Sequence, residues 1–310
     1  MTRVYDAPVA LVWQAWTEAQ HLAQWWGPRG FTITTHARDC RVGGTWVYTM
    51  HGPDGTDYPN FTRYLEVEPR AKLVYDHGAR SEDAAPMFRV TATFTDLGDK
   101  TVLDMRMAFA TEEAALQSRA IIKAAGGYTT WDRLAEFLEQ RASAREIFVM
   151  ARSVEAPIDV VFDLWALPEH LVHWLPPAGF AMTFRHADIR PGGEAAFAMT
   201  SDAFTMHGLF RYVTVDRPSR LEYVQCFTTA DGTLARHPGA PSWPEWMRTS
   251  VHFAAEGPST TRVTVRSSVE GAATAEEIAA FVAERGGMTR GWTGSFDALD
   301  AMVAGTPTGA

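Results

Sequence analysis

The sequence carries one pattern twice, and this repeat limits the possible folds more than any other feature. Residues 3–44 align without a gap with residues 152–193, and 16 of the 42 aligned positions are identical. Trp16 pairs with Trp165 in this alignment, and a second tryptophan follows each of them nine residues later. A period near 150 residues is much longer than a solenoid unit, so the chain of 310 residues is predicted to contain two copies of one domain.

The boundaries of the two copies follow from the repeat. A helical pattern ends near residues 140–145, and a strand-like pattern begins at Ile147. We therefore expect one domain at residues 1–143, a second at residues 144–304, and a flexible tail at residues 305–310.

The first strand is predicted to differ between the copies. Residues 146–155 precede the Ala-Pro pair of the second copy, but only six residues precede Ala7 and Pro8 in the first. Proline removes a backbone donor and fixes φ, which ends a strand. We expect the first strand of the N-terminal copy to be truncated, with the native start of the protein upstream of Met1.

The hydrophobic pattern predicts the same order of elements in both copies. After the first strand, Val9, Val12 and Trp16 have the spacing of a helix. A second short helix, several alternating segments typical of antiparallel strands, and a long helix follow. In the second copy this last helix is expected from Thr274 to Val303. Such an order indicates an α+β fold.

Composition excludes several classes of protein. The formal net charge of −9 argues against a nucleic-acid-binding protein, because phosphates attract basic surfaces. No apolar run approaches the ~18–20 residues of a membrane span, and the chain begins with a strand-like pattern rather than a signal peptide. Two cysteines do not make a disulfide framework and are typical of a reducing compartment, so a cytoplasmic protein is predicted.

Four short motifs are typical of a known family. They are His21-Leu-Ala-Gln-Trp-Trp-Gly-Pro, Arg41-Val-Gly-Gly-Thr-Trp, Ala240-Pro-Ser-Trp-Pro and Gly291-Trp-Thr-Gly-Ser-Phe. With them the sequence resembles the START-like SRPBCC superfamily, and within it the bacterial homologues of the activator of the heat-shock-protein-90 ATPase. The resemblance covers nearly the whole chain, twice. It implies two helix-grip domains, each a curved antiparallel sheet wrapped around a long C-terminal helix with an apolar cavity.

The histidines do not predict a metal site. His170 and His173 have a spacing at which a helix could hold a metal ion, but His173 aligns with Gln24 of the first copy. The sequence also lacks the motifs of zinc peptidases, phosphate-binding loops, serine hydrolases and dinucleotide-binding folds. We therefore expect neither a metal nor a cofactor.

Aromatic and methionine side chains are the better candidates for a functional site. Eleven tryptophans and twelve methionines suit a large apolar interior, although such side chains also simply fill cores. A few polar groups would orient a ligand there. The predicted ligand-binding residues of the first copy are Trp46, Tyr48, His51, Tyr64, Tyr75, Met105, Met107 and Tyr128. Those of the second copy are Phe197, Met199, His207, Tyr212, Tyr223, Trp246, Trp292 and Phe296.

These observations predict a protein that binds a small hydrophobic or aromatic molecule in one or both domains, with no assigned catalytic residue. One alternative is a cyclase- or hydratase-like enzyme for an aromatic or polyketide-type substrate, with His51, Asp57 or His207 as acid or base. A second alternative is a protein-interaction module of a stress response, in which one cavity is filled and the surface is used. Neither a nucleic acid nor a membrane is an expected partner.

Overall fold

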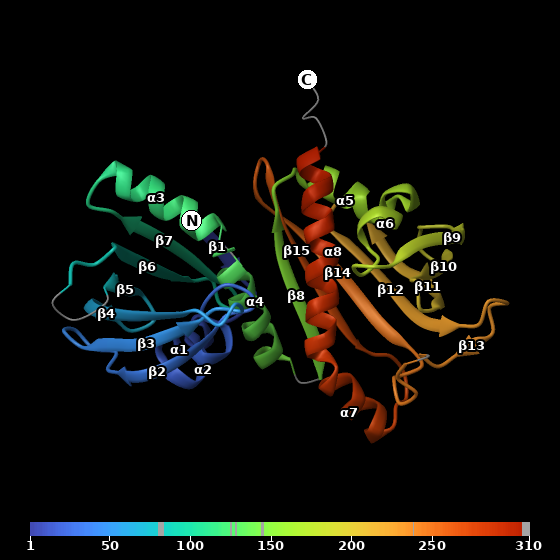
Figure 1. Cartoon of the computed structure of the whole chain (residues 1–310), viewed down its shortest axis with the longest axis horizontal. Helices are drawn as coiled ribbons and strands as arrows, with labels where there is room; N and C mark the ends of the chain where they lie inside the picture. Colours follow the sequence, from blue (N-terminus) through green and yellow to red (C-terminus); the bar gives the residue numbers. More distant parts are fainter. Residues whose placement is uncertain (80–83, 125, 128, 144–145, 238, 306–310) are drawn as a thin grey trace. The chain divides into compact units, whose positions relative to one another are not determined.

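The chain folds into two compact units, Met1–Ala142 and Ser143–Ala310. Each unit combines one antiparallel sheet with short helices and a C-terminal helix, so both are α+β units of the helix-grip type (Figure 1). The structure is a computed structural model, and it describes residues 1–79, 84–124, 126–127, 129–143, 146–237 and 239–305.

The N-terminal unit is built on a seven-stranded antiparallel sheet with the order β1-β7-β6-β5-β4-β3-β2. Consecutive strands from β2 to β7 are neighbours, and β1 returns to pair with β7. The strands are β1 (Thr2–Tyr5), β2 (Thr32–Arg38), β3 (Thr45–His51), β4 (Asp57–Glu68), β5 (Lys72–Ala79), β6 (Phe88–Asp96) and β7 (Thr101–Ala108).

Four helices are found in the described part of this unit. They are α1 (Val9–Thr17), α2 (Ala19–Trp25), α3 (Glu112–Ala124) and α4 (Thr129–Ala142). The side chains of Trp131, Leu134 and Leu138 are buried, because they recur at helical spacing on the face of α4 that packs into the core. This apolar stripe places α4 against the sheet and makes it one wall of the interior.

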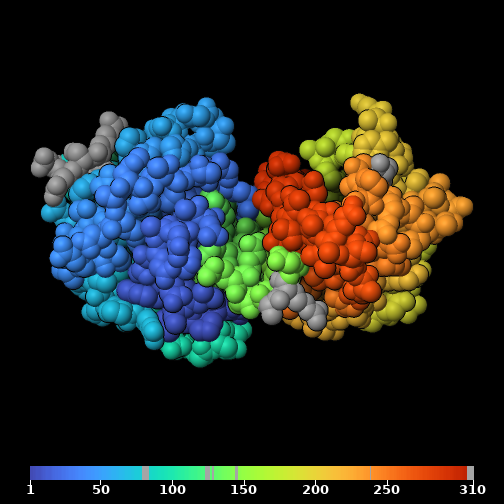
Figure 2. Space-filling view, turned by 90° about the horizontal axis from the view of Figure 1, so that it is seen from below, coloured from blue at the N-terminus to red at the C-terminus, as the bar shows by residue number. Residues whose placement is uncertain are grey.

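The C-terminal unit repeats this plan with the sheet order β8-β15-β14-β12-β11-β10-β9, and the short strand β13 pairs with β12. Figure 2 shows α7 and α8 together on one face of this unit. The elements are β8 (Ile147–Val154), α5 (Ile158–Ala166), α6 (Pro168–Trp174), β9 (Ala181–Ala187), β10 (Glu194–Thr200), β11 (Thr205–Asp216), β12 (Arg220–Thr228), β13 (Leu234–Ala235), β14 (Met247–Gly257), β15 (Thr260–Val269), α7 (Ala275–Ala283) and α8 (Arg285–Gly305).

The repeated tryptophans make the same contact in both units. The indole Nε1 of Trp25 donates a hydrogen bond of 3.0 Å to the carbonyl oxygen of Ala15. Trp174 donates an equivalent bond of 2.8 Å to Leu164. Both rings are fully buried, so the bond satisfies the polar nitrogen of a large apolar side chain. The pair of short helices is therefore held together in the same way twice.

A repeated glycine is explained by a close approach of the backbone. A Cβ atom on Gly44 would lie 2.2 Å from the carbonyl oxygen of Asp39, and one on Gly193 would lie 2.1 Å from that of Asp188. Any other residue would therefore force the turn before β3 or β10 to open.

The last helix of the C-terminal unit differs from the expected single helix from Thr274 to Val303. It consists of two helices, because the backbone of Glu284 has ψ near 0° and interrupts the helical geometry. Thr274 caps the first of them, and its hydroxyl accepts a hydrogen bond of 3.2 Å from the amide of Glu277. Among the described residues, no helix is both long and apolar enough to cross a membrane.

Candidate functional site

An apolar cavity of about 220 Å³, partly open to solvent, lies in the N-terminal unit. Its wall is formed by the sheet, by α3 and α4, and by the segment that follows α2. No lysine, arginine, aspartate or glutamate is among the described residues that line it. The lining residues are Trp26, Gly27, Pro28, Met50, Tyr75, His77, Phe88, Val90, Met105, Met107, Ile121, Ile122, Gly127, Thr130 and Trp131.

The register of three strands creates the sheet wall of the cavity. Tyr75 on β5 lies opposite Val90 on β6, and Val90 lies opposite Met107 on β7. Residues that are directly opposite share one face of the sheet, so these three side chains form a row. His77 follows Tyr75 by two residues and therefore points to the same face.

The polar groups of the cavity are few and uncharged. His77 Nδ1 lies 3.2 Å from the hydroxyl of Thr62, and burial lowers the pKa of His77 to about 4, so its ring is neutral at neutral pH. Burial also raises the pKa of the Tyr75 hydroxyl well above its usual value, which keeps it protonated. Thr130 adds a second hydroxyl. Within the described residues, the Tyr75 hydroxyl and Nε2 of His77 form no hydrogen bond.

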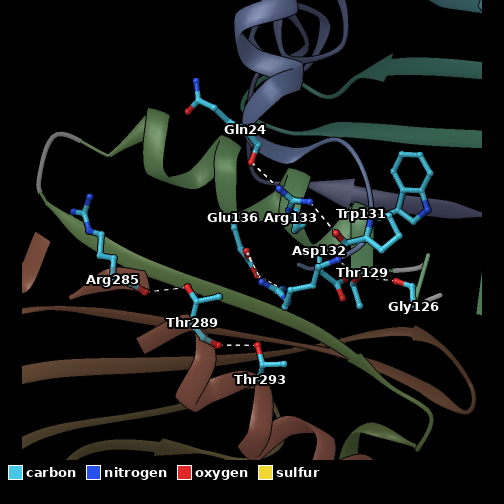
Figure 3. A network of polar contacts seen from close by, with 12 residues as sticks. Gln24, Gly126, Thr129, Trp131, Asp132, Arg133, Glu136, Arg285, Thr289 and Thr293 are labelled. Carbon is cyan, nitrogen blue, oxygen red and sulfur yellow. Dashed lines mark hydrogen bonds and ion pairs between the residues drawn. The ribbon is translucent and has the colours of Figure 1, made fainter. Parts of the chain in front are cut away.

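Arg133 on α4 fixes the segment that closes one end of the cavity. Its Nη1 donates hydrogen bonds of 2.8 Å and 2.9 Å to the carbonyl oxygens of Gly27 and Pro28, and Nη2 donates one of 3.2 Å to Gln24 (Figure 3). Burial lowers the pKa of Arg133 to about 10, so the guanidinium remains charged at neutral pH. The last carbonyl oxygens of a helix have no partner within the helix. Arg133 thus provides hydrogen bonds for a carbonyl at the end of α2 and for two carbonyls beyond it.

Two tryptophan rings of the wall are held in place by contacts behind them. The indole of Trp26 donates a hydrogen bond of 3.1 Å to the hydroxyl of Tyr48. The ring of Trp131 stacks on that of Trp16, with centroids 5.8 Å apart and planes 11° apart. These contacts give the cavity a rigid aromatic surface.

The predicted ligand-binding residues of the first copy fall into several groups. Tyr75, Met105 and Met107 line the cavity, whereas Trp46, Tyr48 and Tyr64 are buried in the core without lining it. His51 lies elsewhere, with Nδ1 2.6 Å from the carboxylate of Asp57 and Nε2 2.9 Å from the hydroxyl of Thr34, and none of these three lines the cavity. Tyr128 lies outside the described residues.

The predicted residues of the second copy are also separated. His207 lines a second hollow, on the sheet of this unit, and the ring of Trp246 lies 4.9 Å from the guanidinium of Arg211. Phe197, Met199, Tyr212, Tyr223, Trp292 and Phe296 belong to the core or pack directly against it, and Phe197 also contributes to the lining of this hollow.

Hydroxyl groups replace part of the apolar row inside the C-terminal unit. Thr249 lies opposite Tyr223 and Ser267 lies opposite Thr249, so these two residues take the places of Val90 and Met107. Their hydroxyls are 3.0 Å apart and both side chains are buried. A hydrogen-bonded pair therefore occupies the position that faces the cavity in the other unit.

The helices of the C-terminal unit also place large side chains in its interior. Trp292 stacks on Trp165 with centroids 5.8 Å apart, as Trp131 does on Trp16. One turn before it lies Met288, which packs against the core, where the N-terminal unit has Gly127. Phe281 on α7 is fully buried and meets the ring of Trp243, with centroids 6.0 Å apart.

Sequence reasoning missed several lining residues of the N-terminal cavity. Trp26, His77, Phe88 and Thr130 were not among the predicted ligand-binding residues. Alternation along β5 would have found His77, because it shares a face with Tyr75. No comparable signal marks Trp26, because the segment after α2 is irregular and is placed by Arg133.

The described residues contain no group of three or more histidine, cysteine, aspartate or glutamate side chains that could hold a metal ion. The two cysteines, Cys40 and Cys226, are free thiols, and burial raises the pKa of both. The arrangement in the N-terminal unit therefore suits binding of an uncharged molecule rather than an ion.

Comparison with known proteins links the chain to one family. The family model described as Activator of Hsp90 ATPase homolog 1-like protein matches residues 6–139 and 155–304. Among proteins with curated descriptions, none matches the chain. Similar solved structures include protein Ms6760 from Mycobacterium smegmatis, which is 22% identical, with a TM-score of 0.42 over 53% of this chain and 93% of that one.

Two further structures are similar. A protein from Arthrobacter aurescens is 27% identical, with a TM-score of 0.42 over 47% of this chain and 87% of that one. The di-domain ARO/CYC StfQ from the steffimycin biosynthetic pathway is 16% identical, with a TM-score of 0.38 over 99% of both chains. The two matched segments of the family model together cover most of the sequence, one in each unit. The chain belongs to the Activator of Hsp90 ATPase homolog 1-like family and carries its domain in two tandem copies.

Proposed function

We propose that the N-terminal unit binds one small, uncharged aromatic or hydrophobic molecule in its cavity. The observation that carries this proposal is an apolar cavity of about 220 Å³ with uncharged polar groups and no charged lining residue among those described. Apolar cavities of about 150 Å³ accept benzene, so this volume suits a larger molecule such as a bicyclic aromatic. Burial of its rings would provide most of the binding free energy.

The polar groups define which substituent such a ligand would carry. Tyr75 offers a protonated hydroxyl, and Nε2 of the neutral His77 ring offers one further hydrogen-bonding position. Both groups would pair with a single hydroxyl or carbonyl group at one end of the molecule. A carboxylate or an amine would be disfavoured, because the described lining provides no opposite charge.

The proposal assigns binding to one unit. In the other unit, the row formed by Tyr223, Thr249 and Ser267 contains a hydrogen-bonded hydroxyl pair, and Phe281 is fully buried. A ligand entering there would have to separate packed groups, which costs binding free energy. The interior of the C-terminal unit therefore serves as the reference for tests of aromatic-ligand binding.

The enzymatic alternative would have to use the cavity groups themselves. His51, Asp57 and His207 do not line the cavity, so an acid or base acting there would be His77 or Tyr75. A histidine with a pKa of about 4 is a weak base at neutral pH, and efficient acid–base catalysts titrate near the working pH. Binding without turnover is therefore the activity that the site favours.

Isothermal titration calorimetry with 2-naphthol, which is uncharged at neutral pH, tests the proposal. Met107→Trp adds a large side chain at the cavity wall, and it should weaken binding at least tenfold. The matched control is Leu97→Trp, an exposed position outside the lining, which should bind like the wild type. Equal binding by all three proteins, or no binding by the wild type, would contradict the proposal.

The natural ligand requires a second experiment. Native mass spectrometry of protein purified from its own host, followed by extraction and identification of the bound molecule, should give a neutral aromatic or hydrophobic compound. Incubation of that compound with the protein then separates binding from catalysis, because a carrier returns it unchanged and an enzyme converts it.

A further inference from the structure

A second hollow, of about 170 Å³, lies on the sheet of the C-terminal unit. Thr183, Ala198, His207 and Thr228 form a row across β9, β10, β11 and β12, because each lies directly opposite the next. Phe197, the neighbour of Ala198 on β10, stacks on the buried ring of Phe210 and so marks the inner face. Since successive side chains alternate, the row lies on the outer face.

Small side chains create this hollow. Ala196 and Ala198 are its floor, where the first copy has Val47 and Thr49 at the aligned positions. In the N-terminal unit the hydroxyl of Thr49 lies 2.8 Å from Nε2 of His36, so the two side chains cover that part of the sheet. The second copy replaces this pair by alanine and arginine, which leaves the floor open.

Hydrogen-bond donors surround the floor. Arg185 takes the place of His36, and its Nη1 donates a bond of 2.9 Å to the carbonyl oxygen of Ala230 in the turn after β12. This bond holds the guanidinium at the rim. Within the described part of the chain, Arg185 has no ion pair, and His207 and the hydroxyls of Thr183 and Thr228 have no hydrogen-bond partner.

No acidic side chain is among the described residues that line the hollow. The nearest carboxylate along the chain, Asp231, accepts hydrogen bonds from the hydroxyl of Thr229 and the amide of Thr233, so it is engaged within its own turn. An arginine beside further hydrogen-bond donors, without a carboxylate, is the arrangement that recognises an oxyanion.

We propose that this outer hollow binds the phosphate or carboxylate group of a small metabolite, with Arg185 as the charged donor and His207 and the threonine hydroxyls as further hydrogen-bond donors. The site is independent of the N-terminal cavity, because it uses another unit and the opposite ligand chemistry. Residues 146–310 carry 12 basic and 19 acidic side chains, so the unit as a whole repels anions. Saturable anion binding would therefore have to come from this local group of donors and not from the net charge of the unit.

Titration calorimetry of the full chain with inorganic phosphate, and separately with succinate, tests the site at constant ionic strength. Arg185→Gln should weaken binding of the preferred anion at least tenfold, because it removes the charge and the fork of donors. Ala198→Leu fills the floor without changing any charge and should have an effect of similar size. Arg190→Gln is the matched control, because Arg190 is an exposed arginine already paired with Asp188, and it should bind like the wild type.

The outcomes distinguish a phosphate from a carboxylate ligand. They also distinguish failure of the anion site from failure of the aromatic-ligand cavity. Stronger binding of phosphate assigns a phosphate group, and stronger binding of succinate assigns a carboxylate. Absence of saturable binding of both anions to the wild type overturns the proposal, as does binding that survives both Arg185→Gln and Ala198→Leu. Binding of 2-naphthol should be unchanged in both variants, so failure of one site does not affect the test of the other.

Discussion

The two units of this chain have the same frame and different interiors. Equivalent tryptophans make equivalent hydrogen bonds, and equivalent glycines allow equivalent turns. Inside this frame, the N-terminal unit holds an apolar cavity with a neutral histidine, whereas the C-terminal unit holds a hydroxyl pair and larger helix side chains. On the outer face the relation is reversed, because the hollow lies in the C-terminal unit.

This difference teaches that the same frame accepts different interior side chains at a few positions. Two of the exchanged residues are matched to each other, since the hydroxyl of Thr249 on one strand pairs with that of Ser267 on the next. The hydrogen-bonded pair of Trp26 and Tyr48 is likewise replaced by two apolar residues. The exchanged positions are Trp26 and Leu175, Tyr48 and Phe197, His77 and Gln225, Val90 and Thr249, Met107 and Ser267, and Gly127 and Met288.

The largest expected difference between the units concerns a buried ion pair. Arg3 Nη1 lies 2.8 Å from the carboxylate of Asp132, and these side chains are 6% and 0% exposed. In the other unit, Arg152 contacts both Asp297 and Asp300, which are 60% and 31% exposed. Asp132→Ala should lower the free energy of unfolding by about 3–5 kcal/mol, because it leaves a buried guanidinium without this carboxylate.

Asp297→Ala is the matched change and should cost no more than about 1 kcal/mol, since its carboxylate is exposed and Asp300 remains. Hydrogen exchange of the intact chain, followed by mass spectrometry of peptides, measures the stability of each unit separately. Similar losses in the two variants would show that the ion pairs are equivalent despite their different burial.

The next effect is a pH dependence of stability that His77 gives to the N-terminal unit. The pKa of His77 falls from 6.5 to about 4 in the folded state, because burial disfavours the charged ring. Between these values the unfolded chain binds a proton that the folded chain does not. The stabilisation is therefore present above pH 6.5 and is lost as the pH falls towards 4, by about 3 kcal/mol in total.

Hydrogen exchange of peptides from the N-terminal unit reports the free energy of unfolding of that unit. Between pH 7 and 4 this free energy should fall less steeply in His77→Phe than in the wild type. The C-terminal unit has Gln225 at this position, and its own His237, whose pKa burial also lowers, adds a change of the same sign there. The comparison is therefore made between variant and wild type within one unit. Parallel curves would show that His77 titrates normally in the folded protein.

A smaller effect is expected from exchanging the hydroxyl pair. Thr249→Val removes one partner and leaves the buried hydroxyl of Ser267 without this contact, which should cost about 1–3 kcal/mol. Val90→Thr introduces a hydroxyl beside Met107 in the other unit, with a penalty in the same range. The free energy of unfolding of each variant can be measured in urea, with hydrogen exchange as the readout for the unit that carries the substitution. A neutral Thr249→Val would mean that Ser267 readily finds another partner.

The sequence predicted the shared frame well and the cavity poorly. The repeat, the helical spacing of Val9, Val12 and Trp16, and the family motifs are local patterns, and they led directly to the α+β helix-grip fold. Alternation along a strand is equally local. It also places His51 and Trp46 on opposite faces of β3, so a stricter use of it would have separated the cavity from the outer surface.

Whether the interior is open could not be predicted, because it depends on contacts between distant segments. Trp243 belongs to the long connection between β12 and β14, whose path no periodic pattern indicates, yet its ring meets the buried Phe281. The segment after α2 is placed by Arg133, more than a hundred residues away. Such packing follows from side-chain volume in three dimensions and not from spacing along the chain.

The smallest predicted effect tests the polar end of the proposed ligand. His77→Phe keeps an aromatic ring against Phe88, whose centroid lies 5.0 Å from that of the His77 ring, but it removes the hydrogen-bonding nitrogens. Affinity for 2-naphthol should fall about tenfold, the value of one hydrogen bond of about 1.4 kcal/mol, whereas affinity for naphthalene should stay the same. Gln225→Phe, the matched change in the C-terminal unit, should alter neither. Equal losses for both compounds would mean that His77 contributes shape alone, and the hydroxyl of the ligand would then have to be assigned to Tyr75.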